Sequence, residues 1–291
     1  MMLWVLVCLM PGIALSTYFL GLGILLNLVL CCLTGFFCEL GNAKLRQTHL
    51  AAAWDGSGFV TATLFALCLP PDVAWHLVCF GAMFAIIFGK LVYGGLGHNP
   101  FNPAMVGYCA MIVCFPLAMS NWPVVVDGSS GATVLDTLHW RSGATIEEVW
   151  QTDNGFGRFA GYSYEWIATA YLLGGVSLIG LKVIKWQAPV AFLSTLALLS
   201  ILFYDNGGSS SLGSPLFHIF AGGAIFAAFF IITDPVTTPD DTRGMMYFAV
   251  GAACLTFIIR SNGGYPDGIA FGVLLMNALV PLYEHVRLKK A

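Results

Sequence analysis

The sequence predicts an all-α integral membrane protein with about ten transmembrane helices. Of its 291 residues, 58% are hydrophobic and 9% are charged, whereas a soluble domain carries roughly 25% charged residues. The mean hydropathy is +0.82, so the few polar groups cannot cover a surface in water. The apolar runs are long and continuous, which favours helices over the alternating strands of a membrane barrel.

Ten apolar segments approach the length of about 20 residues that a helix needs to cross a bilayer. In chain order they are 2–20, 22–40, 57–70, 73–91, 102–119, 165–182, 187–204, 214–232, 245–260 and 268–284. The N-terminus lacks the basic region and the clear cleavage site of a signal peptide. We therefore expect the first segment to remain in the membrane, in contact with lipid.

The basic residues predict how the chain is oriented. Ten spans place both termini on one side of the membrane. The loops on that side hold Lys44, Arg46, Lys90, Lys182, Lys185, Arg243, Arg287, Lys289 and Lys290, and the opposite loops hold Arg141, Arg158 and Arg260. Because positive residues favour the cytoplasm, this distribution predicts cytoplasmic termini and an extracytoplasmic loop at 120–164.

Short segments recur between the two halves of the chain. Residues 93–107 (YGGLGHNPFNPAMVG) are echoed by 262–272 (NGGYPDGIAFG), and 67–73 (LCLPPDV) by 232–236 (ITDPV). Each pair lies five spans apart, and an odd offset turns the second copy upside down. We therefore expect an inverted 5+5 repeat with halves 1–119 and 165–291, unless the echoes arise by chance.

The Gly, Pro and Asn content of these junctions predicts broken helices. Interrupted helices in matching positions often mark a binding site at the repeat interface.

The loop 120–164 is the only long connection between the predicted spans, and it contains the segment 127–133 (DGSSGAT). Small residues leave the hydroxyl of Thr133 accessible, and glycine lets the backbone fold tightly beneath it. On physical grounds the segment is either a site of covalent modification or an ordinary turn. The tryptophans that flank the loop either anchor it at the membrane interface or wall a ring-binding pocket. They are Trp122, Trp140, Trp150 and Trp166.

Several functions are disfavoured by composition. A net charge of -3 without a basic tract gives no reason to expect a nucleic-acid partner. The nine cysteines fall in apolar runs without the paired spacing of zinc or iron–sulfur sites, so we interpret them as small apolar residues and expect no metal site. No acid lies at the centre of a span, where a proton relay is usually found, although sodium could use backbone carbonyls at broken helices.

Four segments together resemble the RnfD/NqrB family of membrane subunits from ion-translocating electron-transport complexes. They are 93–108, 127–137, 230–237 and 259–268, which occur in order over nearly the whole chain. The resemblance implies a subunit of the bacterial inner-membrane Rnf complex, with a periplasmic 120–164 loop. In that complex electrons pass between reduced ferredoxin and NAD while Na⁺ or H⁺ moves. The implied partners are subunits A, B, C, E and G, which would hold the ferredoxin and NAD sites.

In that family the motif D-x-x-S/T-G-A-T is where a flavin transferase attaches FMN, through a phosphoester to the final threonine. The resemblance therefore implies covalent FMN on Thr133. The rest of the attachment motif is Asp127, Ser130, Gly131 and Ala132. We expect Asp127 to serve recognition by the transferase. A near-copy of the motif ends at Thr145 but has His139 where the pattern requires aspartate, so Thr133 is the expected site.

Some relatives hold a second flavin, riboflavin, without a covalent bond inside the membrane subunit. Asn99, Asn102 and Asp234 lie at the broken junctions. They either line such a site or cap helix ends, where Asn and Asp are favoured. Family members usually carry a cytoplasmic segment before the first span, whereas here that span begins at residue 2.

The resemblance implies an electron-transfer subunit that passes electrons through flavin and helps couple their flow to Na⁺ or H⁺ movement. Such a subunit has no catalytic residues for a complete reaction of its own. Two alternatives remain open on the sequence. One is a channel or solute transporter, because an inverted 5+5 repeat suits a urea-channel-like pore. The other is a scaffold that holds neighbouring subunits.

Overall fold

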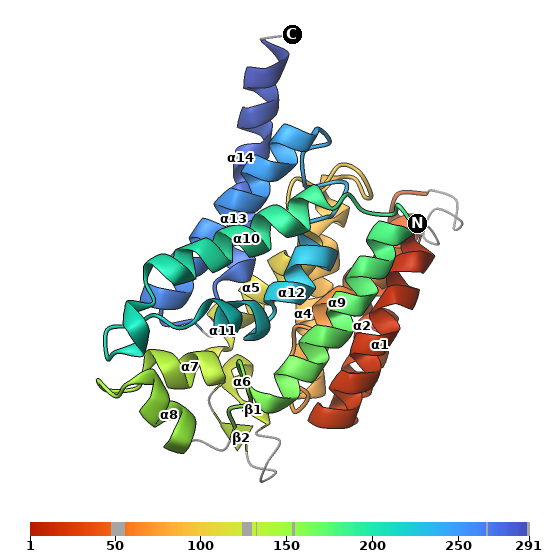
Figure 1. Ribbon diagram of the computed structural model, residues 1–291. Coiled ribbons are helices and arrows are strands. Elements are labelled where there is room, and N and C mark those ends of the chain that lie inside the picture. The colour runs from red at the N-terminus through yellow and green to blue at the C-terminus, as the bar shows by residue number, and fades with distance from the viewer. Residues whose placement is uncertain (48–55, 124–129, 132, 153–154, 266, 290–291) are drawn as a thin grey trace.

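The computed structural model describes residues 1–47, 56–123, 130–131, 133–152, 155–265 and 267–289, and helices make up most of them (Figure 1). The first half contains α1 (Met2–Leu20), α2 (Gly23–Leu45), α3 (Ser57–Ala66), α4 (Trp75–Gly89), the 3-10 turn η2 (Leu91–Tyr93), α5 (Pro103–Cys114) and α6 (Pro116–Ser120). The second half contains α9 (Tyr162–Gly180), α10 (Gln187–Leu202), the 3-10 turn η3 (Asp205–Gly207), α11 (Pro215–Phe220), α12 (Ala224–Phe226), the π-helical η4 (Ala227–Ile231), α13 (Thr242–Asn262) and α14 (Ile269–Leu288). Between the halves lie β1 (Trp122–Pro123), β2 (Ser130–Gly131), α7 (Val134–His139) and α8 (Ile146–Thr152).

The described helices have the composition of a multi-pass membrane protein. Five of them are long and apolar enough to cross a bilayer: Met2–Leu20, Gly23–Leu45, Trp75–Tyr93, Thr242–Asn262 and Ile269–Arg287. The helices α3, α5 and α10 are apolar but shorter. Large apolar side chains point outward, such as Leu3 and Phe37, which are 72% and 65% exposed. Such extensive exposed apolar surface is stable in lipid rather than in water. The count of ten spans remains a prediction.

Two predicted spans are interrupted in the structure. The fifth ends at Phe115, where the backbone leaves the helical region before Pro116 begins α6. The eighth is divided between α11 and α12 at residues 221–223, where Gly222 has a φ of +62°. A positive φ favours glycine, which has no Cβ to clash. Both breaks lie inside spans that the sequence predicts as continuous, 102–119 and 214–232, and outside the repeated junctions where it predicts broken helices.

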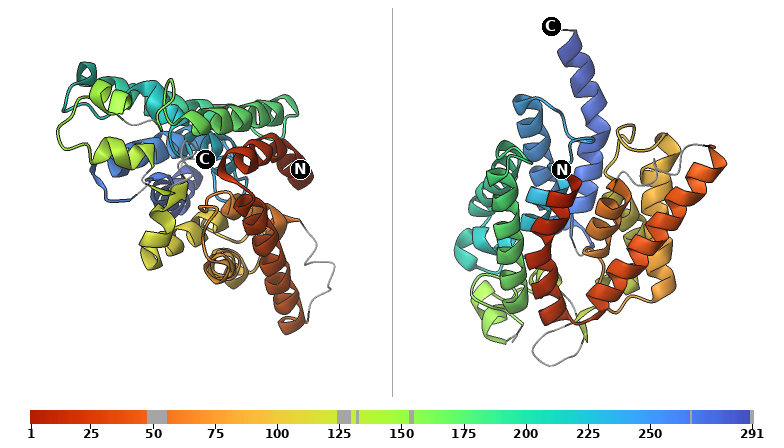
Figure 2. Two further views of the ribbon diagram at one scale, coloured as in Figure 1. Left: turned by 90° about the horizontal axis from the view of Figure 1, so that it is seen from below. Right: turned by 90° about the vertical axis from the view of Figure 1, so that its right-hand side faces the viewer.

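The two halves pack through α1 against α9 and α5 against α14. Figure 2 shows α1 and α9 side by side. A Cβ on Gly174 of α9 would collide with the carbonyl oxygen of Cys8, so glycine is required for this close approach, as is common between membrane helices. The contacts within the first half recur in the second. In the first half, α2 contacts α3 and α4, and α4 packs on α5. In the second half, α10 contacts α11 and α13, and α13 packs on α14.

One buried apolar cluster extends through both halves and includes every residue of η4. A π-helical segment is rare and is frequently found at functional sites. The cysteines pack as small, buried or half-buried side chains, except Cys114, which is exposed. The N-terminal end of α1 and the C-terminal end of α14 both point away from α7, α8 and the β1–β2 pair (Figure 1).

Two basic residues that the sequence pattern assigns to loops are buried instead. Lys90 is 3% exposed and donates hydrogen bonds to Glu39 and Ser57. Arg260 is 7% exposed and lies in the last turn of α13. Without these two, eight basic residues remain in the loops on the side of the termini and two remain in the opposite loops. The predicted orientation is therefore unchanged.

Candidate functional site

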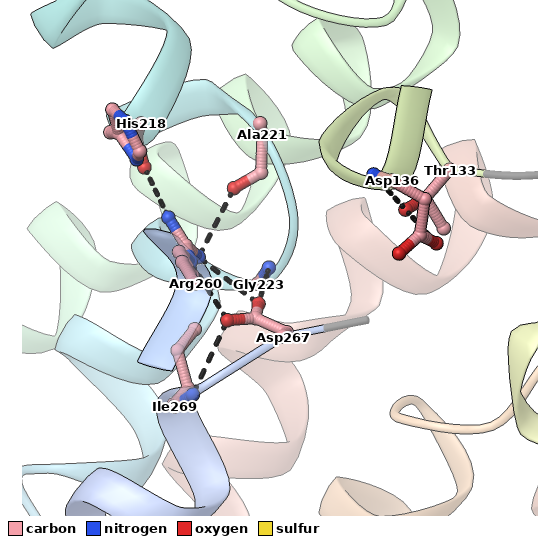
Figure 3. A network of polar contacts seen from close by, with 8 residues as sticks. All are labelled: Thr133, Asp136, His218, Ala221, Gly223, Arg260, Asp267 and Ile269. Atoms are coloured by element: carbon pink, nitrogen blue, oxygen red, sulfur yellow. Dashed lines mark hydrogen bonds and ion pairs between the residues drawn. The ribbon is translucent and has the colours of Figure 1, made fainter. Parts of the chain in front are cut away.

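Thr133 occupies the N-cap position of α7, with an extended backbone at φ −68° and ψ 159°. Its Oγ1 donates a hydrogen bond to Oδ2 of Asp136 at 2.8 Å and accepts one from the backbone N–H of Asp136 at 3.3 Å. Figure 3 shows the two side chains facing each other. A carboxylate that accepts a hydroxyl proton is the arrangement that activates an oxygen nucleophile.

The other residues of the predicted attachment motif are only partly described. Ser130 and Gly131 form β2, which pairs antiparallel with β1 so that Gly131 lies opposite Trp122 and Ser130 opposite Pro123. Asp127 and Ala132 lie outside the described residues. The backbone on both sides of this gap is therefore held by the β1–β2 pair and by α7.

A small apolar cluster fixes α7 against the helical bundle. Val134 and Leu138 are buried with Ala160, Phe217 and Ala221. The last three belong to the segment before α9, to α11 and to the break after it. Thr133 therefore has a defined position relative to the membrane helices, although it lies in the connecting loop.

Thr133 lines a cavity of about 150 Å³ between α7 and the bundle. Its aromatic lining residues are Tyr108, Trp122, Tyr164, Tyr171 and Phe226, and its polar ones include Ser16 and Asp267. The Tyr164 hydroxyl is buried and has no hydrogen-bond partner among the residues that the structure describes. Predominantly apolar walls with a few polar groups are typical of a cofactor pocket. These residues fit a flavin ring.

The carboxylate at this cavity belongs to a buried ion pair. Arg260 Nε donates to Asp267 Oδ1 at 2.8 Å, and Nη2 donates to Oδ2 at 3.0 Å. Asp267 also accepts from the backbone N–H of Gly223 at 3.3 Å and of Ile269 at 3.2 Å (Figure 3). The remaining Arg260 bonds reach the carbonyl oxygens of His218 and Ala221. Bidentate geometry of this kind is the strong form of a charge-assisted contact.

The near-copy of the motif has the same cap but not the same surroundings. Thr145 Oγ1 accepts from the backbone N–H of Glu148 at 3.3 Å, and Glu148 Oε2 accepts from the backbone N–H of Thr145 at 2.8 Å. This is a capping box. Thr133 lines the aromatic cavity, whereas Thr145 is not among the lining residues. The cavity therefore distinguishes two threonines whose local hydrogen bonding is alike.

The three residues predicted for a second flavin come together at another cavity, of about 170 Å³. Asn99, Asn102 and Asp234 all line it, next to Lys90 and to Phe230 of η4. Asn102 Nδ2 donates to Asp234 Oδ2 at 3.3 Å, which joins the start of α5 to the segment after η4.

The capping alternative is confirmed for Asn102 and coexists with its place at the cavity. Asn102 Oδ1 caps α5 by accepting from the backbone N–H of Met105 at 3.2 Å. Its own backbone N–H donates to Asn277 Oδ1 of α14 at 3.0 Å.

Sequence reasoning misses some lining residues of the cavity at Thr133. The sequence marks Asp267 only as an acid near a span end, and its ion-pair partner Arg260, which lies outside this cavity, only as a loop cation. Tyr164 carries no motif at all. The signal that points to Asp267 is its place in 262–272, one of the repeated junctions. Of the four flanking tryptophans, Trp122 lines the cavity, whereas Trp140 and Trp166 are 68% and 53% exposed.

These features define a class: a multi-pass helical membrane protein with cavities in its helical bundle, one of them beside a threonine at a helix start. The chain belongs to the family described as NQR2, RnfD, RnfE, whose profile matches residues 1–291. The resemblance found in the sequence is thereby confirmed.

Relatives in several bacteria are named as the D subunit of an ion-translocating oxidoreductase complex. The chain is 42% identical over 295 residues to that of Pseudomonas paraeruginosa, with 94% of this chain and 86% of the relative covered. It is 42% identical over 303 residues to that of Ectopseudomonas mendocina, with 98% and 88% covered. The Klebsiella pneumoniae protein is 39% identical over 323 residues, with 98% and 91% covered.

Proposed function

We propose that this protein is the membrane subunit of an Rnf-type ion-translocating oxidoreductase complex and carries electrons through FMN attached covalently to Thr133. The observation that carries the proposal is the position of the Thr133 hydroxyl, which lies in the wall of an aromatic cavity and donates to the Asp136 carboxylate. The names of the relatives support the complex and the ion translocation. They favour this function over a solute channel.

The chain's own residues suit the attachment reaction. Asp136 accepts the hydroxyl hydrogen bond of Thr133 and can take its proton as the oxygen attacks the phosphorus of an activated flavin phosphate, whose bond to its leaving group breaks. After esterification Thr133 no longer donates to Asp136, while the backbone N–H of Asp136 still reaches the ester oxygen. A dedicated flavin transferase is the implied partner for this step.

The aromatic cavity suits the isoalloxazine ring. When bound, a flavin accepts electrons singly or in pairs, so it links one-electron carriers to two-electron acceptors. Tyr108, Tyr171 and Phe226 would supply apolar walls that exclude water from a bound ring. The paired Asp267 adds a fixed charge pair near the ring.

The second cavity supports a second, non-covalent flavin such as riboflavin near Asn99, Asn102 and Asp234. The repeated contacts of the helices support the inverted repeat, and the two cavities have similar surroundings. One is lined by the starts of α12 and α14, and the other by the starts of α3 and α5. Neighbouring residues of one segment line different cavities, as Phe230 and Ile231 do. A single layer of chain therefore separates the two.

The proposed orientation places the termini in the cytoplasm and Thr133 in the periplasm of a bacterial inner membrane. The bias of basic residues supports it, and so does the separation of the helix ends from α7 (Figure 1). Covalent attachment has a physical use on the outer face, because a dissociated cofactor would be lost from the cell. Subunits A, B, C, E and G are the proposed partners.

A denaturing gel viewed under ultraviolet light tests the attachment. In a host with the transferase and ample flavin, the wild-type band should fluoresce, the Thr133→Ala band should be dark and the Thr145→Ala band should fluoresce. Both variants lose a helix cap of the same kind, so folding defects are matched. A dark wild-type band, or a fluorescent Thr133→Ala band, contradicts the proposal. Mass analysis of the peptide that contains Thr133 identifies the modified side chain.

A further inference from the structure

The position of Thr133 depends on how α7 is held, because Thr133 begins this helix. α7 has six residues, and isolated helices shorter than about 12 residues are marginal in water. The buried side chains of Val134 and Leu138 hold it against the bundle. Apolar contacts are non-directional, so they do not by themselves fix how far the helix is turned or shifted along its axis. Directional bonds from α7 to the bundle therefore decide where the Thr133 hydroxyl points.

Arg141, two residues beyond the end of α7, makes such bonds. Its Nη2 donates to the carbonyl oxygen of Ser209 at 2.7 Å and to that of Ser211, and its Nη1 donates to the carbonyl oxygen of Leu138 at 3.4 Å. One guanidinium thus joins the last turn of α7 to the connection between α10 and α11. The ion pairs found among the described residues do not include Arg141, so carbonyl oxygens rather than carboxylates hold it.

The loop that receives Arg141 is shaped by its own hydrogen bonds. Its two ends are joined by the backbone N–H of Leu212, which donates to the carbonyl oxygen of Phe203 at 3.1 Å. Within the loop, the backbone N–H of Ser211 donates to the carbonyl oxygen of Gly208 at 3.1 Å and closes a tight turn. Because the loop is held without the arginine, the contact sets the position of α7 rather than that of the loop.

A cavity beside the guanidinium gives access to this contact. Arg141, His139 and the segment 209–211 line a polar cavity of about 230 Å³. Leu135 lines both this polar cavity and the aromatic cavity at Thr133, so α7 lies between the two. A small cation in the polar cavity can therefore reach the carbonyl oxygens when the arginine side chain is shortened.

We propose that Arg141 is a positioning residue for the attachment of flavin to Thr133. By binding the carbonyl oxygens of Ser209 and Ser211 it fixes the register of α7, and α7 in turn holds the Thr133 hydroxyl at the wall of the aromatic cavity. The proposal rests on the proposed attachment of FMN to Thr133. Arg141 is not among the residues that line the aromatic cavity, so it acts on the reaction only through α7.

The rate of flavin attachment tests this role in the purified full-length chain, made without flavin and mixed with the transferase and its flavin donor. Arg141→Ala should lower the maximal rate about tenfold or more, because misplacing a reacting group by about 1 Å can cost a hundredfold. The donor concentration that gives half the maximal rate should not change. Arg158→Ala is the matched control, because Arg158 is an exposed arginine of the same connecting loop that contacts Phe159. A wild-type maximal rate in Arg141→Ala, or equal slowing in Arg158→Ala, overturns the proposal.

Chemical rescue separates positioning from a loss of folding. Guanidinium chloride at millimolar concentration should raise the rate of Arg141→Ala, because the free cation can occupy the oxygens that the arginine leaves, whereas sodium chloride should not. Failure of guanidinium to raise the rate contradicts the assignment. Arg141→Lys should be slowed less than Arg141→Ala, since an ammonium keeps the charge but lacks the planar fork. If Arg141→Ala does not fold, Arg141→Lys replaces it, and a wild-type rate in that variant contradicts the proposal.

Amide exchange in the flavin-free chain reports on α7 without any attachment. The backbone N–H groups of Thr137 and Trp140 donate to the carbonyl oxygens of Thr133 and Asp136. They should exchange faster in Arg141→Ala than in the wild type, and guanidinium should slow them again. If the wild type takes up no flavin, the proposed function fails, whereas unchanged exchange beside normal wild-type attachment refutes only the role of Arg141.

Discussion

Arg260 and Asp267 form a bidentate ion pair whose two members line different cavities. Asp267 lies at the aromatic cavity beside Thr133, and Arg260 at the polar cavity beside Arg141. The pair thus forms part of the wall between the two cavities. It also joins the end of α13 to the start of α14.

Breaking this pair should destabilise the protein strongly. Arg260→Gln leaves the Asp267 carboxylate buried without its partner, which costs about 3–5 kcal/mol. Arg287→Gln is a matched control, since Arg287 pairs with Asp241 at side-chain exposures of 50% and 29%. An exposed pair contributes at most about 1 kcal/mol. Thermal unfolding in the same detergent checks the difference; equal shifts in melting temperature contradict it.

Replacing Gly222 by alanine should also destabilise the fold, for two reasons. The φ of +62° is unfavourable for a residue with a Cβ, at about 1–3 kcal/mol, and that Cβ would lie 2.5 Å from Asp267 Oδ2. Gly95→Ala tests the strain alone, because Gly95 has a φ of +104° and open space around it. We expect Gly222→Ala to lower the unfolding temperature more than Gly95→Ala does. If Gly95→Ala lowers the unfolding temperature more, a clash with Asp267 is not what destabilises Gly222→Ala.

Asp136→Asn should slow flavin attachment to Thr133. The substitution keeps the backbone N–H of residue 136, which donates a hydrogen bond to Thr133 Oγ1. It removes the carboxylate that accepts the hydrogen bond of the Thr133 hydroxyl and would take its proton. Proton acceptors of this kind typically contribute at least about a hundredfold. The time course of the fluorescent band after flavin is supplied measures the rate. Glu148→Gln, the matching position three residues after Thr145, should leave that rate unchanged; equal slowing in both variants speaks for a structural effect instead.

The second cavity predicts a selective loss of non-covalent flavin. Asn102→Ser retains a capping hydroxyl for α5 but loses the amide at the cavity, so flavin retention should fall about threefold to tenfold. The ratio of flavin released by denaturation to covalent flavin measures the loss. Asn262→Ser, at the exposed end of α13, is the control. An unchanged ratio in both Asn102→Ser and Asp234→Asn argues against a flavin there.

The start of α8 should weaken in acid. The backbone N–H of Thr145, followed by its hydroxyl, lowers the pKa of Glu148 below the ordinary 4.5. A group whose pKa is depressed by folding stabilises the fold above its unfolded pKa and loses that contribution as the pH falls through its folded pKa. Amide exchange in α8, corrected for intrinsic rates, should therefore accelerate below about pH 4.5. Glu148→Gln should remove this pH dependence, and its persistence in that variant points to another group.

The helices and Thr133 were accessible from the sequence because both depend on local information. A bilayer selects long apolar runs whatever their neighbours, so hydropathy located α1 and α2 closely. The breaks near Phe115 and Gly222 were not predicted, because both fall inside apolar runs that hydropathy alone joins into one span. Thr133 was predicted from a contiguous motif of the family, which is legible in adjacent residues. Local hydrogen bonding does not distinguish Thr133 from Thr145. Each hydroxyl accepts from the backbone N–H of an acidic residue three positions later.

The sequence by itself determined the membrane class, the approximate positions of several helices and the threonine expected to carry flavin, since hydropathy and motifs act over short stretches of chain. Only the tertiary structure decided that Lys90 and Arg260 are buried ion-pair partners rather than loop charges. It alone placed Tyr164 beside Thr133, and Arg141, His218 and Ser261 around one cavity. The physical reason is that hydrogen bonds and cavities depend on distances of a few ångströms between segments far apart in the chain, which are set only when the helices pack.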